Sequence, residues 1–349
     1  MKVIVTGTGG YLGSLLVPQL LERGHDVTGV DVGFYRSGYL YHAHGNVPRT
    51  IVKDTRLLTS DDISGNDALI HMAELSNDPS GELAPNITHK INHEGSVRLA
   101  HIAKKSGVKM FIYMSSCSVY GQTDGDHPVT EETPVNPQTA YALCKTLCER
   151  DIMKLADKNF SPVFFRNATA YGASPRQRFD LVVNNLSALA WTTNKIDLLS
   201  DGSPWRPLVH GFDIGRAICC ALDSYDTNIH GQIVNIGSNE QNHRIREVAE
   251  IVAKASDCKK ITFGVIADDN RSYRVNFDKL SKLLPTFKCG WNVTAGVAQL
   301  MQLFENIELT NEDFRFRPYT RMEQLKFLMR TKQIDGDFYW KEQSCRTII

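Results

Sequence analysis

The sequence has no excess of charge of either sign, because 39 aspartates and glutamates balance its 39 lysines and arginines. Nucleic acids and anionic membrane surfaces bind proteins largely through basic patches, and a formal net charge of +0 provides no such footprint. The chain also has no apolar run close to the roughly 20 residues that a membrane-spanning helix needs. We therefore expect no nucleic-acid partner and no membrane partner.

Metal-binding and targeting signals are missing as well. The eight cysteines include no Cys-x-x-Cys spacing, so we expect no metal site. The pairs Cys144/Cys148 and Cys219/Cys220 fit small core residues in a reducing cytosol better than they fit disulfides. The first residues enter an apolar run without a basic segment and a cleavage site, so we expect no secretion signal and a cytoplasmic location.

What the chain does have is a glycine-rich turn at its start. The apolar, β-rich run 2–6 is followed at once by Gly7-Thr-Gly-Gly10-Tyr-Leu-Gly13 and then by a helical pattern of leucines. Strand, glycine turn and helix form the context that a dinucleotide site requires, since the backbone can approach a pyrophosphate beside a helix N-terminus. The spacing is Gly-x-x-Gly-x-x-Gly, because Leu12 occupies the last glycine position of the Gly-x-Gly-x-x-Gly register.

An acidic residue ends the second β-like run, Asp26–Asp31. Asp31 stands at the distance from the glycine turn at which an acid contacts the adenosine ribose of a dinucleotide. Its carboxylate would accept hydrogen bonds from the ribose hydroxyls and repel a 2′-phosphate. The sequence therefore favours NAD over NADP.

Tyr141 and Lys145 stand four residues apart in a segment that reads as a helix over 139–155. Residues at i and i+4 share one helix face, so the ammonium group of Lys145 can lie beside the phenol of Tyr141. A nearby positive charge favours the phenolate, and we expect it to lower the pKa of Tyr141 from its ordinary value of about 10. A tyrosine tuned in this way can take a proton from an alcohol near neutral pH.

The glycine turn and the Tyr-x-x-x-Lys pair together resemble the extended short-chain dehydrogenase/reductases, most closely the nucleotide-sugar epimerase and dehydratase branch. The likeness covers nearly the whole chain. It implies an enzyme that uses NAD and acts on a nucleotide sugar. It also implies a homodimer formed through the helices around residues 85–106 and 139–156.

The order of elements favours an α/β fold with a Rossmann-type, doubly wound parallel sheet. We expect strands near 2–6, 26–31, 50–53, 67–72, 109–115 and 162–167, and helices near 11–23, 85–106 and 139–156. Further helices are expected near 178–192, 244–256 and 294–306, with loops over 204–207 and 264–274. The resemblance implies an NAD-binding domain over 1–172, to which later segments return, and a smaller, mainly substrate-binding α/β domain over 173–308. The amphipathic runs of residues 309–349 suggest a helical C-terminal extension.

The resemblance also implies which residues contact the cofactor. Asp54-Thr-Arg56 resembles the segment whose acid contacts adenine, and Ile70-His-Met-Ala73 resembles the strand end that lies against the cofactor. Glu74 replaces the small residue that is usual there. The expected cofactor contacts are Gly7, Gly10, Tyr11, Leu12, Gly13, Asp31, Asp54, Thr55, Met72, Ala73, Glu74, Asn92, Ser115, Tyr141 and Lys145.

For catalysis, the resemblance places Ser116 at the catalytic serine or threonine position, beside Tyr141 and Lys145. Three residues match family positions that contact the substrate diphosphate, and arginine suits this task because its fork matches phosphate oxygens. With Ser116, these give the expected substrate contacts Asn185, Arg206 and Arg271. Thr169 departs from the family pattern, in which asparagine is common.

The two residues after Ser116 bear on the reaction type. Related dehydratases and decarboxylases place a carboxylate there, whereas this chain has Cys117 and Ser118. A Ser–Tyr–Lys set without that carboxylate can move a hydride and a hydroxyl proton. We therefore expect C4 oxidation and reduction, with a 4-epimerase favoured over a net dehydrogenase or ketoreductase.

A hypothesis from another class is a protein that binds NAD without turnover and acts as a sensor or scaffold. Such chains usually lose the catalytic tyrosine or lysine, and this chain keeps both. The sequence leaves open the nucleotide base, the sugar, the choice between epimerase and net oxidoreductase, and the role of the extension.

Overall fold

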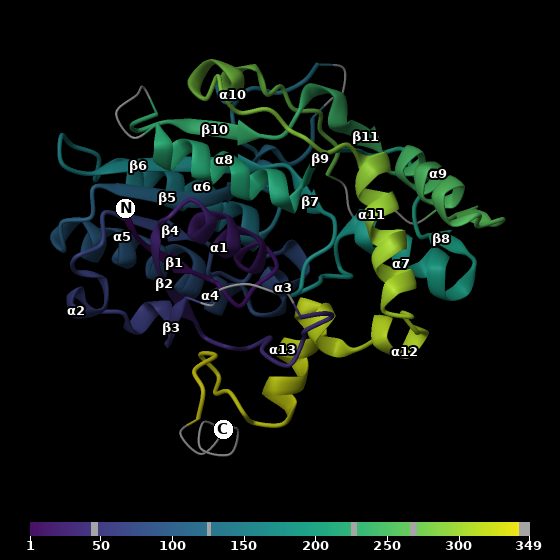
Figure 1. Cartoon of the computed structure of the whole chain (residues 1–349), viewed down its shortest axis with the longest axis horizontal. Helices are drawn as coiled ribbons and strands as arrows, with labels where there is room; N and C mark the ends of the chain where they lie inside the picture. The colour runs from purple at the N-terminus through teal and green to yellow at the C-terminus, as the bar shows by residue number, and fades with distance from the viewer. Residues whose placement is uncertain (43–47, 124–126, 225–228, 266–270, 342–349) are drawn as a thin grey trace.

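The computed structural model describes residues 1–42, 48–123, 127–224, 229–265 and 271–341. Its centre is a seven-stranded sheet in the order β10-β6-β5-β4-β1-β2-β3, in which every neighbouring pair is parallel (Figure 1). This order confirms the expected doubly wound sheet, whose direction of winding reverses between β1 and β4. The strands are β1 Lys2–Thr6, β2 Asp26–Asp31, β3 Arg49–Val52, β4 Ala68–His71, β5 Met110–Ser116, β6 Ser161–Asn167 and β10 Ile233–Ile236.

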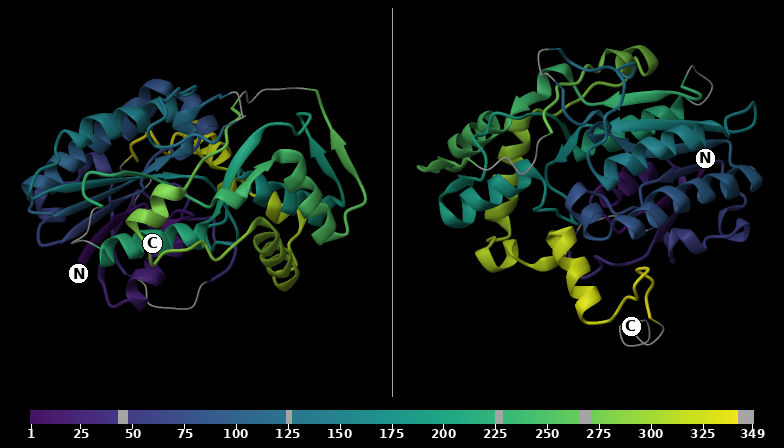
Figure 2. Two further views of the ribbon diagram at one scale, coloured as in Figure 1. Left: turned by 90° about the horizontal axis from the view of Figure 1, so that it is seen from above. Right: turned by 180° about the vertical axis from the view of Figure 1, so that it is seen from behind.

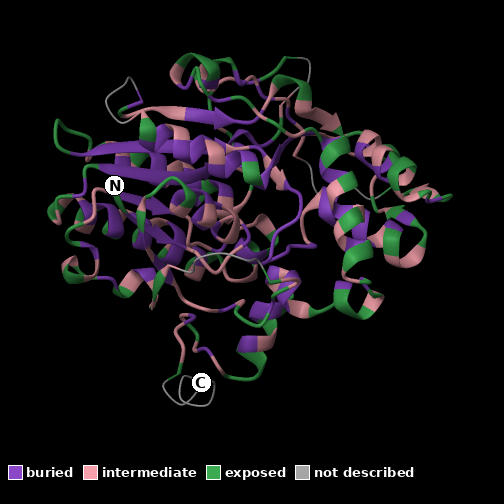
Figure 3. Cartoon of the chain, viewed as in Figure 1, coloured by how far each residue is buried: buried purple, intermediate pink, exposed green. Residues whose placement is uncertain are grey.

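Helices cover both faces of this sheet, and the strand residues alternate between them. Val3 and Val5 pack toward α1 (Gly13–Glu22) and α8 (Gly211–Asp223), whereas Ile4 packs toward α5 (Ser96–Lys105) and α6 (Ala140–Met153). The inner strands are therefore buried on both sides, as the buried ribbon at the centre of Figure 3 shows. Short helices at the rim are α2 Ser60–Ile63, which contacts α5, and α10 Asp278–Leu283, which contacts β10.

The segment expected as one helix over 85–106 has a more varied structure. It begins as α4 (Pro85–Thr88), continues as a π-helical stretch over His89–Gly95 and ends as α5. A further helix, α3 (Asp78–Leu83), precedes it and contacts α6. Sequence periodicity does not distinguish a π-helical turn inside a longer helix, because such a turn shifts the register by a single residue.

A smaller part lies beside the sheet and is built from three packed helices and two small sheets (Figures 1 and 2). Its helices are α7 Val182–Thr193, α9 Ile245–Ser256 and α11 Val293–Asn306. One sheet has the order β11-β9-β7, with β7 Thr169–Tyr171, β9 Trp205–His210 and β11 Asn242–Arg244. The other pairs β8 (Ile196–Leu198) with β12 (Ile261–Phe263).

The loop expected over 204–207 is wrong, since β9 begins at Trp205 and runs through Pro207 as the middle strand of its sheet. Two prolines suggested a break, but β9 pairs with β11 over residues 205–207, Pro207 included, and with β7 over residues 208–210. Helix α7 also begins four residues later than expected, because Leu181 has an extended backbone. Of the loop expected over 264–274, residues 266–270 lie outside the described part of the chain.

The C-terminal residues form α12 (Asn311–Phe314), a short 3-10 turn and α13 (Arg321–Arg330), and they pack against the segment that follows β2. Gln324 Nε2 donates to the carbonyl oxygen of Phe34 at 2.9 Å, and Trp340 Nε1 donates to that of Val32 at 2.6 Å. Two segments about 300 positions apart in the sequence thus lie side by side, near Asp31, the acidic residue that ends β2. The domain boundaries expected at residues 172 and 308 stay a prediction.

Within the described ranges, no helix is long and apolar enough to cross a membrane. The same residues contain no cluster of histidine, cysteine, aspartate and glutamate side chains placed to hold a metal ion.

Candidate active site

A cavity of about 680 Å³ opens at the carboxyl ends of the central strands. Its walls come from the β1–α1 turn, the ends of β2, β4 and β5, helix α6 and segments of the smaller part. It lies where the direction of winding reverses, which is the position at which open parallel sheets bind ligands. The cavity therefore has room for a dinucleotide at the sheet and a second ligand toward the smaller part.

The glycine turn fits the pyrophosphate of a dinucleotide. Gly7 has φ +82°, and a Cβ atom there would lie 3.1 Å from backbone atoms of Met72 and Ala73. At Gly13, the first residue of α1, a Cβ atom would collide with the carbonyl oxygen of Gly7. Because the glycines carry no side chains, the backbone forms a cradle at the N-terminus of α1. The residues of this turn that line the cavity are Gly7, Gly10, Tyr11, Leu12 and Gly13.

Asp31 lies beside this cradle with its carboxylate fixed by two backbone amides. Gly9 N donates to Oδ2 at 2.9 Å and Gly33 N donates to Oδ1 at 2.7 Å. Burial raises the pKa of Asp31, while these donors, Arg176 and Arg321 act in the opposite direction. Asp54 and Thr55 line the same end of the cavity, and Asp54 accepts two hydrogen bonds from Arg56, at 3.0 and 2.8 Å.

Asn92 lies behind the cavity wall. Its side chain is fully buried and makes two hydrogen bonds of 2.9 Å to the backbone N–H and carbonyl of Leu75. The residue therefore holds the loop that follows β4, and its expected contact with the cofactor stays a prediction. Met72, Ala73 and Glu74, in the same loop, line the cavity.

Ser116, Tyr141 and Lys145 lie close together at the carboxyl end of β5. Ser116 ends the strand, where its Oγ accepts a hydrogen bond from Ser118 N at 3.1 Å. The ammonium nitrogen of Lys145 lies 5.4 Å from the ring centroid of Tyr141. Thr139 caps α6 by accepting from Ala142 N at 3.1 Å, which fixes where the helix presents Tyr141.

The pKa of Tyr141 departs from the sequence expectation. Burial raises it above its ordinary value, and this effect outweighs the lowering by Lys145; Glu74 and Asp78 raise it further. Lys145 lowers the pKa of Tyr141, as predicted, but the local sequence did not show that Tyr141 is buried. A positive charge that enters the cavity with a ligand would act in the same direction as Lys145.

Glu74, which departs from the family pattern, points at Lys145. Its Oε2 lies 2.6 Å from Lys145 Nζ, and the two side chains are 2% and 6% exposed. Tyr113 donates to Glu74 Oε1 at 2.6 Å, and Ser96 donates to the same oxygen at 3.2 Å.

Cys117, the first residue of the 3-10 turn that follows β5, is buried and faces the core. Its Sγ donates to the carbonyl oxygen of Arg166 at 3.2 Å, and burial raises the pKa of the thiol. Ser118 lines the cavity, and so does Thr169, at the start of β7.

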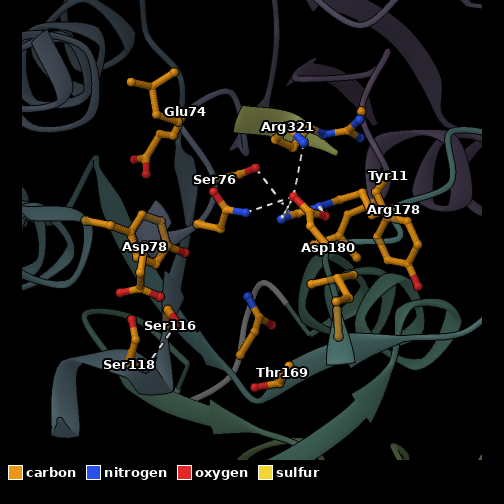
Figure 4. Close-up of a pocket in the computed structure, with 18 of the residues that line it drawn as sticks. Tyr11, Glu74, Ser76, Asp78, Ser116, Ser118, Thr169, Arg178, Asp180 and Arg321 are labelled. Atoms are coloured by element: carbon orange, nitrogen blue, oxygen red, sulfur yellow. Dashed lines mark hydrogen bonds and ion pairs between the residues drawn. The ribbon is translucent and has the colours of Figure 1, made fainter. Parts of the chain in front are cut away.

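The three expected diphosphate contacts also line the cavity, on its side toward the smaller part. Asn185 on α7 donates to the carbonyl oxygen of Phe179 at 2.9 Å. Arg206 on β9 donates to its neighbour's carbonyl at 2.9 Å and to that of Arg271. Arg271 makes an ion pair with Asp78, a cavity residue that the sequence analysis missed and that lies on the same side of the cavity as Ser116 in Figure 4.

A cluster of opposite charges was missed as well. Arg178 Nε donates to Asp180 Oδ1 at 2.8 Å, while Asn77 and the backbone N–H of Arg321 donate to Asp180 Oδ2 at 2.8 and 3.1 Å (Figure 4). Arg178 lowers the pKa of Asp180. Charged residues stand at every second position over residues 176–180, but this pattern resembles an exposed strand, and the contribution of α13 comes from the far end of the chain.

Comparison with known proteins shows the family to which this chain belongs. Residues 3–237 match the model of the NAD dependent epimerase/dehydratase family. Over 266 residues, the chain is 28% identical to an uncharacterized UDP-glucose epimerase, YtcB, of Bacillus subtilis, covering 72% of this chain and 81% of that one.

Another relative is a UDP-N-acetyl-alpha-D-glucosaminuronate decarboxylase of Bacillus cytotoxicus, 27% identical over 71% of this chain and 78% of that one. Among solved structures, MoeE5 in complex with UDP-glucuronic acid and NAD has a TM-score of 0.75 at 24% identity, covering 88% of this chain and 99% of that chain. At this identity the structural likeness supports the fold.

Proposed function

Because the chain belongs to the NAD dependent epimerase/dehydratase family, we propose that this NAD-dependent enzyme inverts C4 of a nucleotide-diphosphate sugar through a 4-keto intermediate. The observation that carries the proposal is the grouping of Ser116, Tyr141 and Lys145 at one cavity wall, with Cys117 turned into the core. This set can move a hydroxyl proton and hold an alkoxide. Cys117 and Ser118 offer no carboxylate for chemistry at a neighbouring carbon.

In this proposal Tyr141, as the phenolate, takes the proton of the C4 hydroxyl and later returns it. Ser116 donates a hydrogen bond to the same oxygen and stabilises the charge that develops there. Lys145 favours the phenolate and holds the nicotinamide ribose. NAD, when bound, supplies the hydride acceptor at C4.

The diphosphate of the substrate would bind where Asn185, Arg206 and Arg271 line the cavity. In the structure, Arg271 forms an ion pair with the carboxylate of Asp78. This carboxylate takes the place that an anionic ligand would have on the guanidinium group. A diphosphate would compete for Arg271, because a guanidinium fork matches phosphate oxygens as well as it matches a carboxylate. Substrate binding would therefore release Asp78 toward Thr139, whose hydroxyl already donates to it.

The expected homodimer and cytoplasmic location are part of the same proposal. Leu143, on α6, is 45% exposed and lies in one of the two helices expected to form the dimer. Sedimentation of the purified protein tests the dimer, and Leu143→Glu should shift it toward the monomer.

Incubation of the protein and NAD with a panel of nucleotide sugars tests the function. We expect a product of unchanged mass and inverted C4 configuration, without net formation of NADH, and no product with the Tyr141→Phe variant. Net formation of NADH with a product two hydrogens lighter would assign a dehydrogenase instead. Loss of water or of carbon dioxide would overturn the C4 proposal, and Asp78 would then be the first carboxylate to examine, because Glu74 is bound to Lys145.

A further inference from the structure

The environment of the Lys145 ammonium group differs from that of a lysine whose charge acts on a neighbouring tyrosine alone. Its nitrogen contacts the carbonyl oxygen of Met114, lies 2.6 Å from Glu74 Oε2, and lies 4.6 Å from the ring centroid of Tyr113. The carboxylate is fixed in turn by the hydroxyl groups of Tyr113 and Ser96. Three elements, β5, α5 and the loop after β4, thus hold one buried carboxylate against the lysine.

A buried carboxylate at this distance has two electrostatic effects. It stabilises the ammonium form of Lys145, which would otherwise be costly to bury. It also cancels much of the positive field that Lys145 exerts on Tyr141, because opposite charges 2.6 Å apart act at a distance as a dipole. Lys145 therefore stays charged, while the phenolate gains less from that charge.

The other titratable groups around the pair do not supply this compensation. Burial raises the pKa of Cys144, Cys148 and Tyr113, which favours their neutral forms, and lowers the pKa of His71 to about 3.

Two further charged side chains face Tyr141, and each has an opposite charge of its own. Asp78, from α3, pairs with Arg271, and Arg178, from the segment after β7, pairs with Asp180. Glu74 is the carboxylate that contacts Lys145 directly.

We propose that Glu74 is a positioning residue that holds Lys145 in place and, by compensating its charge, moves the working range of the Tyr141 base to higher pH. This deepens the proposed function and rests on its assignment of Tyr141 as the base. A base works in its deprotonated form, so a group that disfavours the phenolate moves the acid limb of the activity profile upward.

The first test needs no sugar substrate, so its failure is separate from failure of the proposed function. The ultraviolet absorbance of tyrosinate is titrated for the full-length protein with NAD bound, and the titration of the Tyr141→Phe variant is subtracted to isolate Tyr141. We expect the midpoint to fall by about one pH unit or more in Glu74→Gln, which removes the charge and keeps the shape, because the phenolate itself then becomes the counter-ion of the Lys145 ammonium group. Glu74→Asp keeps the charge and should restore a midpoint close to that of the original protein.

Asp151→Asn is the matched control. Asp151 lies on the same helix and pairs with His93 and Lys154 on its outer side, so its neutralisation should leave the midpoint unchanged. An unchanged or higher midpoint in Glu74→Gln would overturn the proposal, as would a shift of equal size in Asp151→Asn. Once a substrate is known, the acid limb of kcat/KM should move in the same direction as the midpoint, and an acid limb that stays in place would also refute it.

Discussion

Asp31 allows a quantitative prediction about cofactor choice. A 2′-phosphate on the adenosine ribose would place a second anion near this carboxylate, which two backbone amides hold in place. Two unit charges about 4 Å apart repel by about 1 kcal/mol in water and by about 4 kcal/mol at an effective dielectric of 20. Since about 1.4 kcal/mol corresponds to a factor of ten, we expect NADH to bind tenfold or more tightly than NADPH.

Two arginines lie close enough to challenge this prediction, but both are already engaged. Arg176 donates to the carbonyl oxygens of Tyr35 and Arg36, at 3.0 and 2.7 Å. Arg321 donates to the carbonyl oxygen of Pro318 at 2.7 Å and stacks 4.2 Å from the ring centroid of Tyr35. A 2′-phosphate would therefore meet the carboxylate before it could recruit a guanidinium.

Fluorescence titration with NADH and NADPH at low and at high salt measures the preference. The NADH preference should shrink in Asp31→Asn, which removes the charge and keeps an acceptor for one of the two amides. Because Asp31 is largely buried, salt should weaken the repulsion less than this substitution does. Equal or tighter binding of NADPH by the unaltered protein would refute the reasoning, and Arg176 would then be the residue to substitute.

Three further predictions concern turnover, cofactor retention and stability. Tyr141→Phe should lower turnover about 100-fold or more and leave the dissociation constant of NADH nearly unchanged; weaker NADH binding would argue for a structural role of the hydroxyl. Trp340→Ala should weaken NADH binding about fivefold, because it deletes a hydrogen bond that holds the loop after β2, whereas Trp191→Ala, which deletes a similar bond far from that loop, should not. Glu149→Gln should lower the unfolding free energy by about 3–5 kcal/mol in urea titrations, because it leaves the buried Arg166 without its full charge partner. A decrease as small as that caused by removing the exposed partner Asp151 from Arg150 would contradict this.

The fold was predictable from the sequence where local pattern determines local structure. The first strand, the glycine turn, the first helix and the acid that ends the second strand follow one another within about 30 residues, and each carries its own signal. The pair Tyr141/Lys145 is local as well, because one helix turn joins the two residues. Strand β9 was missed because two prolines dominate its pattern, while its pairing with β7 and β11 depends on segments roughly 35 residues away.

The candidate site was less predictable wherever its chemistry depends on burial or on distant partners. Glu74 was recognised as a departure from the family pattern, yet its partner stands about 70 positions later and is brought close by the packing of α6 on the sheet. The same holds for the pKa of Tyr141, whose largest determinant is burial. The cluster around Asp180 joins three segments, one of them the C-terminal helix, which no local motif connects.

In the structure, the reaction type depends less on Cys117 and Ser118 than on Asp78 and its partner Arg271. Cys117 and Ser118 offer no carboxylate, but Asp78 on α3 brings one to the same part of the cavity. In the present arrangement Arg271 and Thr139 bind both of its oxygens, which leaves it poorly suited to accept a proton from carbon. If a diphosphate draws Arg271 away, Asp78 loses the cation that favours its ionised form and becomes a better proton acceptor. An unchanged product mass would therefore mean that Asp78 takes no proton from carbon, even though the proposed diphosphate contact draws Arg271 away from it.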